Sequence, residues 1–142
     1  TDEIFGSLRG SKPVVLIFCQ QHGDEPSGKE AALVLAREMT QSENKLLQNL
    51  DLILVPQMNP DGSEKGQRNN ANDMDLNRNH AILSEPETAA LHQLFLEWMP
   101  EITLDVHEYS AVSEKWVKHG FIKNADVQLG KVSNANISIS QL

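Results

Sequence analysis

Three short apolar runs, separated by segments of helical pattern, constrain the fold of this chain more than any other feature. They are residues 13–20 (PVVLIFCQ), 50–57 (LDLILVPQ) and 102–109 (ITLDVHEY), and all three contain β-branched residues. Nearly continuous apolar runs of this length are typical of strands that are buried on both faces, as in parallel or mixed sheets. Such strands need helices on both sides of the sheet, so the segments between the runs decide the fold class.

Two of these segments have a helical pattern. After the first run, apolar residues recur at helical spacing and predict a helix over residues 27–40. Before the third run, Ser84 and Glu87 form a capping-box pattern, which predicts a second helix that ends near Pro100. The order of these elements predicts an α/β fold with a mixed, largely parallel central sheet and helices on both faces.

Residues 58–81 lie between the second run and the second helix and show no apolar periodicity. They are rich in Asn, Asp and Gly, and residues 59–62 (NPDG) have the composition of a turn. A loop of this length inside a compact domain is usually functional or disordered. Ligand-binding residues are therefore expected here.

Composition excludes several classes of partner. The formal net charge is -8, from 20 acidic and 12 basic residues, whereas nucleic acids and anionic membranes require clustered Lys and Arg. The longest apolar stretch, residues 14–19, is too short to span a bilayer. Cys19 is the single cysteine, which leaves no disulfide framework and no thiolate metal cage. We expect no nucleic-acid and no membrane partner.

Three candidate metal ligands lie where two of the expected strands end. His22 and Glu25 follow the first run, and His107 lies near the end of the third. Ligands in open α/β sheets bind beyond the carboxyl ends of strands, and two imidazoles with a carboxylate form a catalytic zinc set. The spacing alone is weak, because 5 His and 12 Glu give roughly 0.4 H-x-x-E pairs by chance. The alternative is a loop histidine beside a glutamate that the helix dipole favours.

The long loop adds a second kind of chemistry. Arg68, Asn77 and Arg78 could hold a carboxylate beside a metal, because guanidinium groups pair with carboxylates bidentately. The alternative is a solvated loop with surface arginines. His80 is expected to be a solvated loop residue, and His92 a surface or boundary residue of the second helix.

Taken together, five motifs resemble the zinc metallocarboxypeptidase family, the carboxypeptidase A-like exopeptidases. They are QHGDEPSG (residues 21–28), NPDG (59–62), Arg68, DLNRN (75–79) and DVHEY (105–109), and they occur in the family's order. The EPSG and SEPET segments are similar to the bacterial-type branch of the family. The resemblance covers about residues 12 to 110. It implies that residues 1–142 are the N-terminal portion of a catalytic domain.

The resemblance also implies a role for each matching residue. His22, Glu25 and His107 would bind one Zn²⁺ ion, and Asp75 would orient the first histidine. Arg68 would polarise the scissile carbonyl. The terminal carboxylate of a peptide would bind Asn77 and Arg78. Asp105 is a rival for the orienting role, because it lies on the same strand face as His107, whereas Glu108 points to the opposite face.

One part of the family's machinery has no match. The family's general base is a glutamate on a late strand, preceded by a substrate-capping tyrosine. The acids after His107 are Glu108, Glu114 and Asp126, and none has that context. We therefore expect a sheet that is incomplete at the C-terminus, and a chain that alone binds metal and carboxylate but hydrolyses peptides poorly.

The leading hypothesis is a zinc metallocarboxypeptidase that acts on peptides with a free C-terminal carboxylate. One alternative keeps the zinc and acts on N-acyl amino acids, as in the succinylglutamate desuccinylase and aspartoacylase deacylases. Another is a non-catalytic module that binds carboxylates or peptides and lacks the general base. The compartment is open, with a secreted or periplasmic location favoured over the cytoplasm, and the sequence leaves the oligomeric state open.

Overall fold

A computed structural model describes Gly6, Leu8, residues 10–41, 45–109 and 117–120, and Val127. The chain divides into two compact units, Thr1–Glu108 and Tyr109–Leu142, and each is considered by itself. In the second unit, residues 117–120 include a turn in which the Gly120 N–H donates to the Val117 carbonyl. Glu114 and Asp126 lie outside the described residues. The candidate site belongs to the first unit.

The first unit contains a parallel sheet of three described strands. These are β1 (Val14–Cys19), β2 (Asp51–Val55) and β3 (Ile102–Val106), which confirm the three predicted strands. Their order is β2-β1-β3, and Leu16 of β1 pairs with Ile53 on one side and Thr103 on the other. The chain runs from β1 to β2 on one side and then crosses from β2 to β3 on the other side of β1. The carboxyl ends of β1 and β3 therefore form a switch point, where ligands bind in such sheets.

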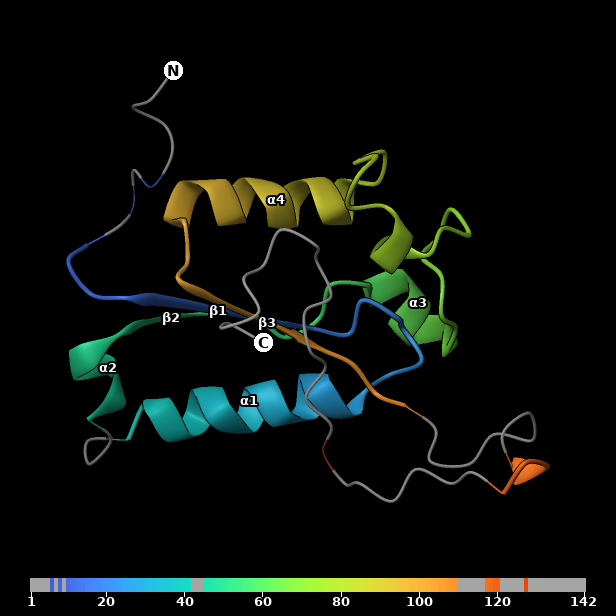
Figure 1. Cartoon of the computed structure of the whole chain (residues 1–142), viewed down its shortest axis with the longest axis horizontal. Helices are drawn as coiled ribbons and strands as arrows, with labels where there is room; N and C mark the ends of the chain where they lie inside the picture. The colour runs from blue at the N-terminus through green and yellow to red at the C-terminus, as the bar shows by residue number, and fades with distance from the viewer. Residues whose placement is uncertain are drawn as a thin grey trace. The chain divides into compact units, whose positions relative to one another are not determined.

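Helices cover both faces of this sheet, which confirms the predicted α/β fold class. Figure 1 shows α1 (Ser27–Met39) on one face and α4 (Pro86–Trp98) on the other. Three shorter elements complete the described helices: α2 (Leu46–Asn49), α3 (Pro60–Lys65) and the 3₁₀ helix η1 (Leu76–Arg78). No helix among the described residues has the length and apolar character needed to cross a membrane.

The core lies mainly between the sheet and α4. It is a cluster of buried apolar side chains with three half-buried neighbours: Leu16, Phe18, Met58 and Leu91, with Ile53, Val55 and Leu94. On the opposite face, α1 approaches closely because Gly28 has no side chain. A Cβ atom there would lie 2.9 Å from Cγ1 of Val106 and 3.3 Å from Cβ of Cys19.

The predicted capping box before α4 is wrong. Glu85, not Ser84, is the N-cap residue, and its side chain makes no capping hydrogen bond. Asn79 from the preceding loop instead fixes the start of the helix, since its Oδ1 accepts from the N–H of the N-cap residue Glu85 at 3.1 Å and from Thr88 Oγ1 at 2.6 Å. A local sequence pattern could not reveal this competition from a distant amide.

The long loop is also more ordered than its composition indicated. Residues 59–62 open α3 instead of forming a simple turn, because the Asn59 side chain accepts from the Gly62 N–H at 2.8 Å and Pro60 occupies the first helical turn. The helix ends at Gly66, whose φ of 60° is the left-handed conformation that glycine adopts readily.

β3 is at an edge of the sheet that the described residues form, so its outer flank is unpaired there. Ile102 and Leu104 are 52% and 44% exposed, although both belong to an apolar strand. This exposure agrees with the expectation of a sheet that continues beyond β3.

Candidate metal centre

The loop after β1 approaches α3 closely at a glycine, which has no side chain to prevent the contact. His22 is 3% exposed and Gly23 follows it. A Cβ atom on Gly23 would lie 2.1 Å from the backbone carbon of Gly62 and 2.4 Å from the backbone nitrogen of Ser63. The glycine is therefore required by close packing of two backbones, and this packing fixes the position of the His22 ring.

His22, Glu25 and His107 meet at the carboxyl ends of β1 and β3. One nitrogen or oxygen atom from each lies within 4.8 Å of the others. Nδ1 of His22 is 2.7 Å from Oε1 of Glu25, and Nδ1 of His107 is 2.9 Å from Oε2 of the same carboxylate. The two imidazoles therefore present the same ring nitrogen to one shared carboxylate.

The second ring nitrogen of each histidine faces a different aspartate. Nε2 of His22 lies 3.2 Å from Oδ1 of Asp75, and Nε2 of His107 lies 2.9 Å from Oδ2 of Asp105. Asp75 and Asp105 are thus not rivals, because each contacts one imidazole. A carboxylate that accepts from one ring N–H leaves the other nitrogen free to bind a metal.

Asp75 also connects the first histidine to the long loop. Its Oδ2 accepts from Nε and Nη2 of Arg68 at 3.1 and 3.0 Å, and its Oδ1 accepts from the Asn77 N–H at 2.9 Å. Nδ2 of Asn77 lies 3.2 Å from Nε2 of His107. Arg78 is exposed, and its Nη1 donates to the Asn77 carbonyl at 3.1 Å. The structure therefore brings Arg68 and Asn77 to the centre, with Arg78 beside them.

Glu108 was expected to point away from the centre, but it contacts both α1 and Glu25. Its Oε2 accepts from the N–H of Ser27 at 3.1 Å and from Ser27 Oγ at 2.7 Å, which ties it to the first residue of α1. Its own N–H donates to Oε2 of Glu25 at 3.0 Å. Glu108 thereby fixes the Glu25 carboxylate and is already occupied at the helix N-terminus.

The surroundings of the centre lower the pKa of two carboxyl groups, Glu25 and Asp75, and raise the pKa of His107. Burial opposes ionisation of Glu25, but hydrogen bonds from the Glu108 N–H and both histidines outweigh it and lower the Glu25 pKa. The pKa of Asp75 is also lowered, because the Arg68 guanidinium outweighs partial burial. The hydrogen bond to Asp105, with further help from Glu25, raises the pKa of His107 to about 9.

The residues present fit a single divalent zinc ion. Two imidazole nitrogens and one carboxylate are zinc's preferred donors in catalytic sites, and both imidazoles are backed by carboxylates. The raised pKa of His107 reflects two carboxylates facing one ring, an arrangement in which a cation can replace the proton on Nδ1.

Several residues of the centre were missed by sequence reasoning. Nδ2 of the fully buried Asn59 donates to the carbonyls of Gln21 and Arg68 at 3.1 and 3.2 Å, so this residue joins the His22 loop to the Arg68 segment. His80 is not solvated, since it contacts Gln21 and His92. Buried amides carry little sequence signal of their own, and only the NPDG pattern pointed to Asn59.

An α/β sheet with two histidines and a glutamate at its switch point has the donor set of a mononuclear metal site. A profile of zinc carboxypeptidases matches residues 5–123. Carboxypeptidase 2 of Trichophyton rubrum is 35% identical over 119 residues, covering 82% of this chain and 22% of the relative. Carboxypeptidase SOL1 of Arabidopsis thaliana is 35% identical over 108 residues, covering 65% and 21%. This chain belongs to the zinc carboxypeptidase family.

Solved structures agree with this assignment. A metallo-carboxypeptidase from Pseudomonas aeruginosa superposes with a TM-score of 0.61 and 29% identity, over 70% of this chain and 28% of that one. Carboxypeptidase A from Helicoverpa armigera gives 0.61 and 25%, over 71% and 34%. The chain thus spans about a fifth of the curated relatives and about a third of the solved domains. Assignment to the bacterial-type branch stays a prediction.

Proposed function

We propose that this chain carries the metal and carboxylate sites of a zinc metallocarboxypeptidase that removes C-terminal residues from peptides. The carrying observation is the convergence of Nδ1 of His22 and Nδ1 of His107 on the Glu25 carboxylate, at 2.7 and 2.9 Å. His22, Glu25 and His107 would hold one zinc ion. The bound ion supplies a Lewis acid that polarises a carbonyl and lowers the pKa of a water molecule.

The chain's own residues would bind and orient the substrate. Arg68 donates two of its five N–H groups to Asp75, so the remaining donors can meet negative charge on the scissile carbonyl. Asp75 holds this guanidinium beside His22. Arg78 is exposed and directs one N–H to the Asn77 carbonyl, so its other donors, with the Asn77 amide, can take the terminal carboxylate of a peptide.

The matches to carboxypeptidases support a peptidase over a deacylase of N-acyl amino acids. The general base is not among the acids assigned above, because Glu25, Asp75 and Asp105 contact the histidines and Glu108 caps α1. We infer that a segment outside the described residues supplies it.

The test measures hydrolysis of three substrates by the zinc-loaded full-length protein. The substrates are a peptide with a free C-terminal carboxylate, the matched peptide amide and an N-acyl amino acid. We expect release of the terminal residue from a peptide with a free carboxylate, and loss of that activity in Arg78→Ala or in the matched peptide amide. Equal cleavage of the amide would contradict the carboxylate site. Preference for an N-acyl amino acid would favour the deacylase, and metal-dependent binding without turnover would favour a non-catalytic module.

A further inference from the structure

Gln21 is a fully buried polar residue at the point where β1 becomes the metal-site loop. It is 0% exposed, and its side chain links two other parts of the unit. Nε2 donates to Oδ2 of Asp105 on β3 at 2.9 Å, and Oε1 lies 2.7 Å from Nε2 of His80 in the loop after η1. The Gln21 carbonyl is itself held by Nδ2 of Asn59 at 3.1 Å. Each hydrogen-bonding atom of this amide side chain therefore has a partner on a separate segment.

Chemistry fixes the direction of these hydrogen bonds. The Gln21 Oε1 can only accept, so Nε2 of His80 carries a proton and donates to it. A carboxylate accepts hydrogen bonds, so Asp105 receives them from Gln21 Nε2 and from Nε2 of His107. With this proton on Nε2, the lone pair of a neutral His107 is on Nδ1, the nitrogen that faces Glu25 and the proposed metal.

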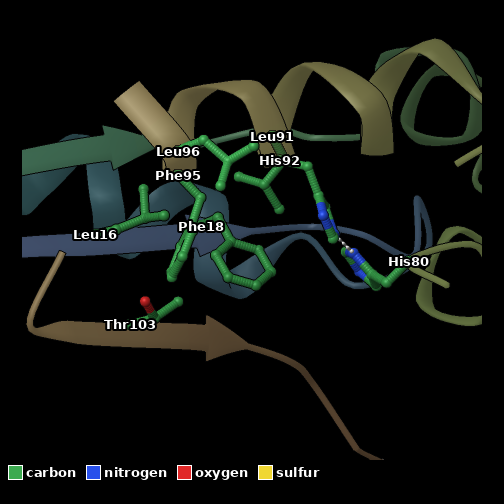
Figure 2. Close-up of a pocket in the computed structure, with 8 residues that line it drawn as sticks. All are labelled: Leu16, Phe18, His80, Leu91, His92, Phe95, Leu96 and Thr103. Carbon is green, nitrogen blue, oxygen red and sulfur yellow. Dashed lines mark hydrogen bonds between the residues drawn. The ribbon is translucent and has the colours of Figure 1, made fainter. Parts of the chain in front are cut away.

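The chain of contacts ends in a pair of imidazoles. Nδ1 of His80 and Nε2 of His92 are 3.0 Å apart, and their rings stack with centroids 5.3 Å apart. Figure 2 shows the two rings facing each other at the polar end of a cavity of about 360 Å³ that Leu16, Phe18 and Phe95 also line. Burial and the neighbouring His92 lower the pKa of His80. A neutral His80 accepts at Nδ1 while it donates from Nε2.

We propose that Gln21 is a positioning residue for the metal ligand His107, acting through Asp105, and that His80 fixes the orientation of the Gln21 amide. This inference rests on the proposed zinc site. Without the His80 donor, the amide could turn and place its oxygen against the Asp105 carboxylate. Without Gln21, Asp105 loses its hydrogen bond from a buried donor. The Asp105 side chain is 35% exposed on the edge strand, so this loss would leave its position less fixed.

The location of β3 explains why His107 needs this support. His22 is enclosed by the loop packed on α3, and its ring is backed by an aspartate that Arg68 also binds. The His107 side chain is 30% exposed and follows a strand whose outer flank is open among the described residues. Gln21 joins this histidine's acceptor to the buried end of the central strand. Groups that orient a ligating histidine typically change metal affinity 10–100-fold when altered.

The test measures zinc affinity of the full-length protein by competition with a chromophoric chelator. Gln21→Met keeps the side-chain length and removes both hydrogen bonds. We expect about tenfold weaker zinc binding in Gln21→Met and a loss at least as large in Asp105→Asn. The double variant should be little weaker than Asp105→Asn alone, because both substitutions interrupt one path. Thr40→Val, which removes the side-chain hydrogen bond to the Arg37 carbonyl at the end of α1, away from these residues, is the control.

A second readout separates positioning from general destabilisation. In metal-free protein, the ¹⁵N chemical shift of Nε2 of His107 reports its hydrogen bond to Asp105. This shift should move in Gln21→Met and in His80→Phe, but not in Thr40→Val. The His80 variant keeps Gln21 and thus serves if the Gln21 variant does not fold.

The inference is overturned if the His107 Nε2 chemical shift and the zinc affinity are unchanged in the folded variants. It is also overturned if the losses of zinc affinity in Gln21→Met and Asp105→Asn simply add in the double variant. Failure of the unaltered protein to bind zinc would instead overturn the proposed function. The two failures are therefore distinguishable.

Discussion

The two histidines of the centre stand in unlike surroundings. The His22 side chain is 4% exposed, follows the central strand and lies in a loop whose backbone packs against α3. The His107 side chain is 30% exposed and follows β3, where Ile102 and Leu104 are exposed on the open flank. The first half of the centre is fixed by dense packing, and the second by a path of hydrogen bonds. This difference indicates which substitutions damage the fold and which damage the metal site alone.

The largest expected effect comes from Gly23→Ala, in the packed half. The added Cβ would lie 2.1 Å from the Gly62 backbone, where no flexible side chain can yield. We expect the free energy of unfolding to fall by about 3 kcal/mol or more, measured by urea denaturation. Gly66→Ala is the control, since nothing lies within 4 Å of its Cβ position and only its φ of 60° is unfavourable, at about 1–2 kcal/mol. Equal losses would contradict the packing account.

Asp75→Asn comes next, because Asp75 joins His22, Arg68 and Asn77. We expect zinc affinity to fall about 10–100-fold, by analogy with other groups that orient metal-binding histidines. Substrate turnover should also fall, since the Arg68 guanidinium loses its anchor. Asp73→Asn in the same loop is the control, because Asp73 binds Asn69 and makes no contact with the centre. Similar zinc affinities for the two variants would count against the role of Asp75.

The pH dependence of the free energy of unfolding should report on the His107 part of the centre. In metal-free protein the pKa of His107 is raised from its ordinary 6.5 to about 9, first by the hydrogen bond to Asp105. A raised pKa means that the fold binds the proton more tightly than the unfolded chain does. The resulting stabilisation is complete below about pH 6.5 and is lost as the pH rises through 9. Urea denaturation of the metal-free protein should show this decline, and Asp105→Asn should reduce it. A decline of the same size in that variant would reject Asp105 as its source.

The smallest expected effect lies on the open flank of β3. Leu104→Ala in the 142-residue chain should lower the free energy of unfolding by less than about 1 kcal/mol, because Leu104 is 44% exposed. The same substitution at Leu16, which is 1% exposed in the core, should cost about 3 kcal/mol. Thermal or urea unfolding of the two variants measures the contrast. A large cost at Leu104 would mean that other residues of the chain cover this flank.

The sequence predicted the features that depend on local pattern. The three strands were predicted from continuous apolar runs, and the two long helices from helical spacing and a capping pattern. The largely parallel sheet followed from their order. His22, Glu25 and His107 were expected to meet because they follow strands whose carboxyl ends share one edge, and the structure brings them within 4.8 Å. Their role as zinc ligands stays a proposal.

What the sequence did not predict depends on side-chain contacts that no local pattern marks, some of them between distant segments. Asn79 binds the N-cap residue Glu85 of α4 where a capping box from Ser84 was expected, and Asn59 begins a helix where a turn was expected. The link from His80 through Gln21 to Asp105 joins three segments with no shared motif. Buried amides act through geometry that only the folded chain creates.

X-ray absorption spectroscopy at the zinc edge tests the central claim most directly. In the zinc-loaded full-length protein, we predict one zinc ion with two imidazoles and further oxygen ligands, at about 2.0–2.2 Å. His22→Ala and His107→Ala should each leave one imidazole on any zinc that still binds. An imidazole count that is unchanged in both variants, or a sulfur neighbour in the unaltered protein, would contradict a zinc centre built from His22, Glu25 and His107.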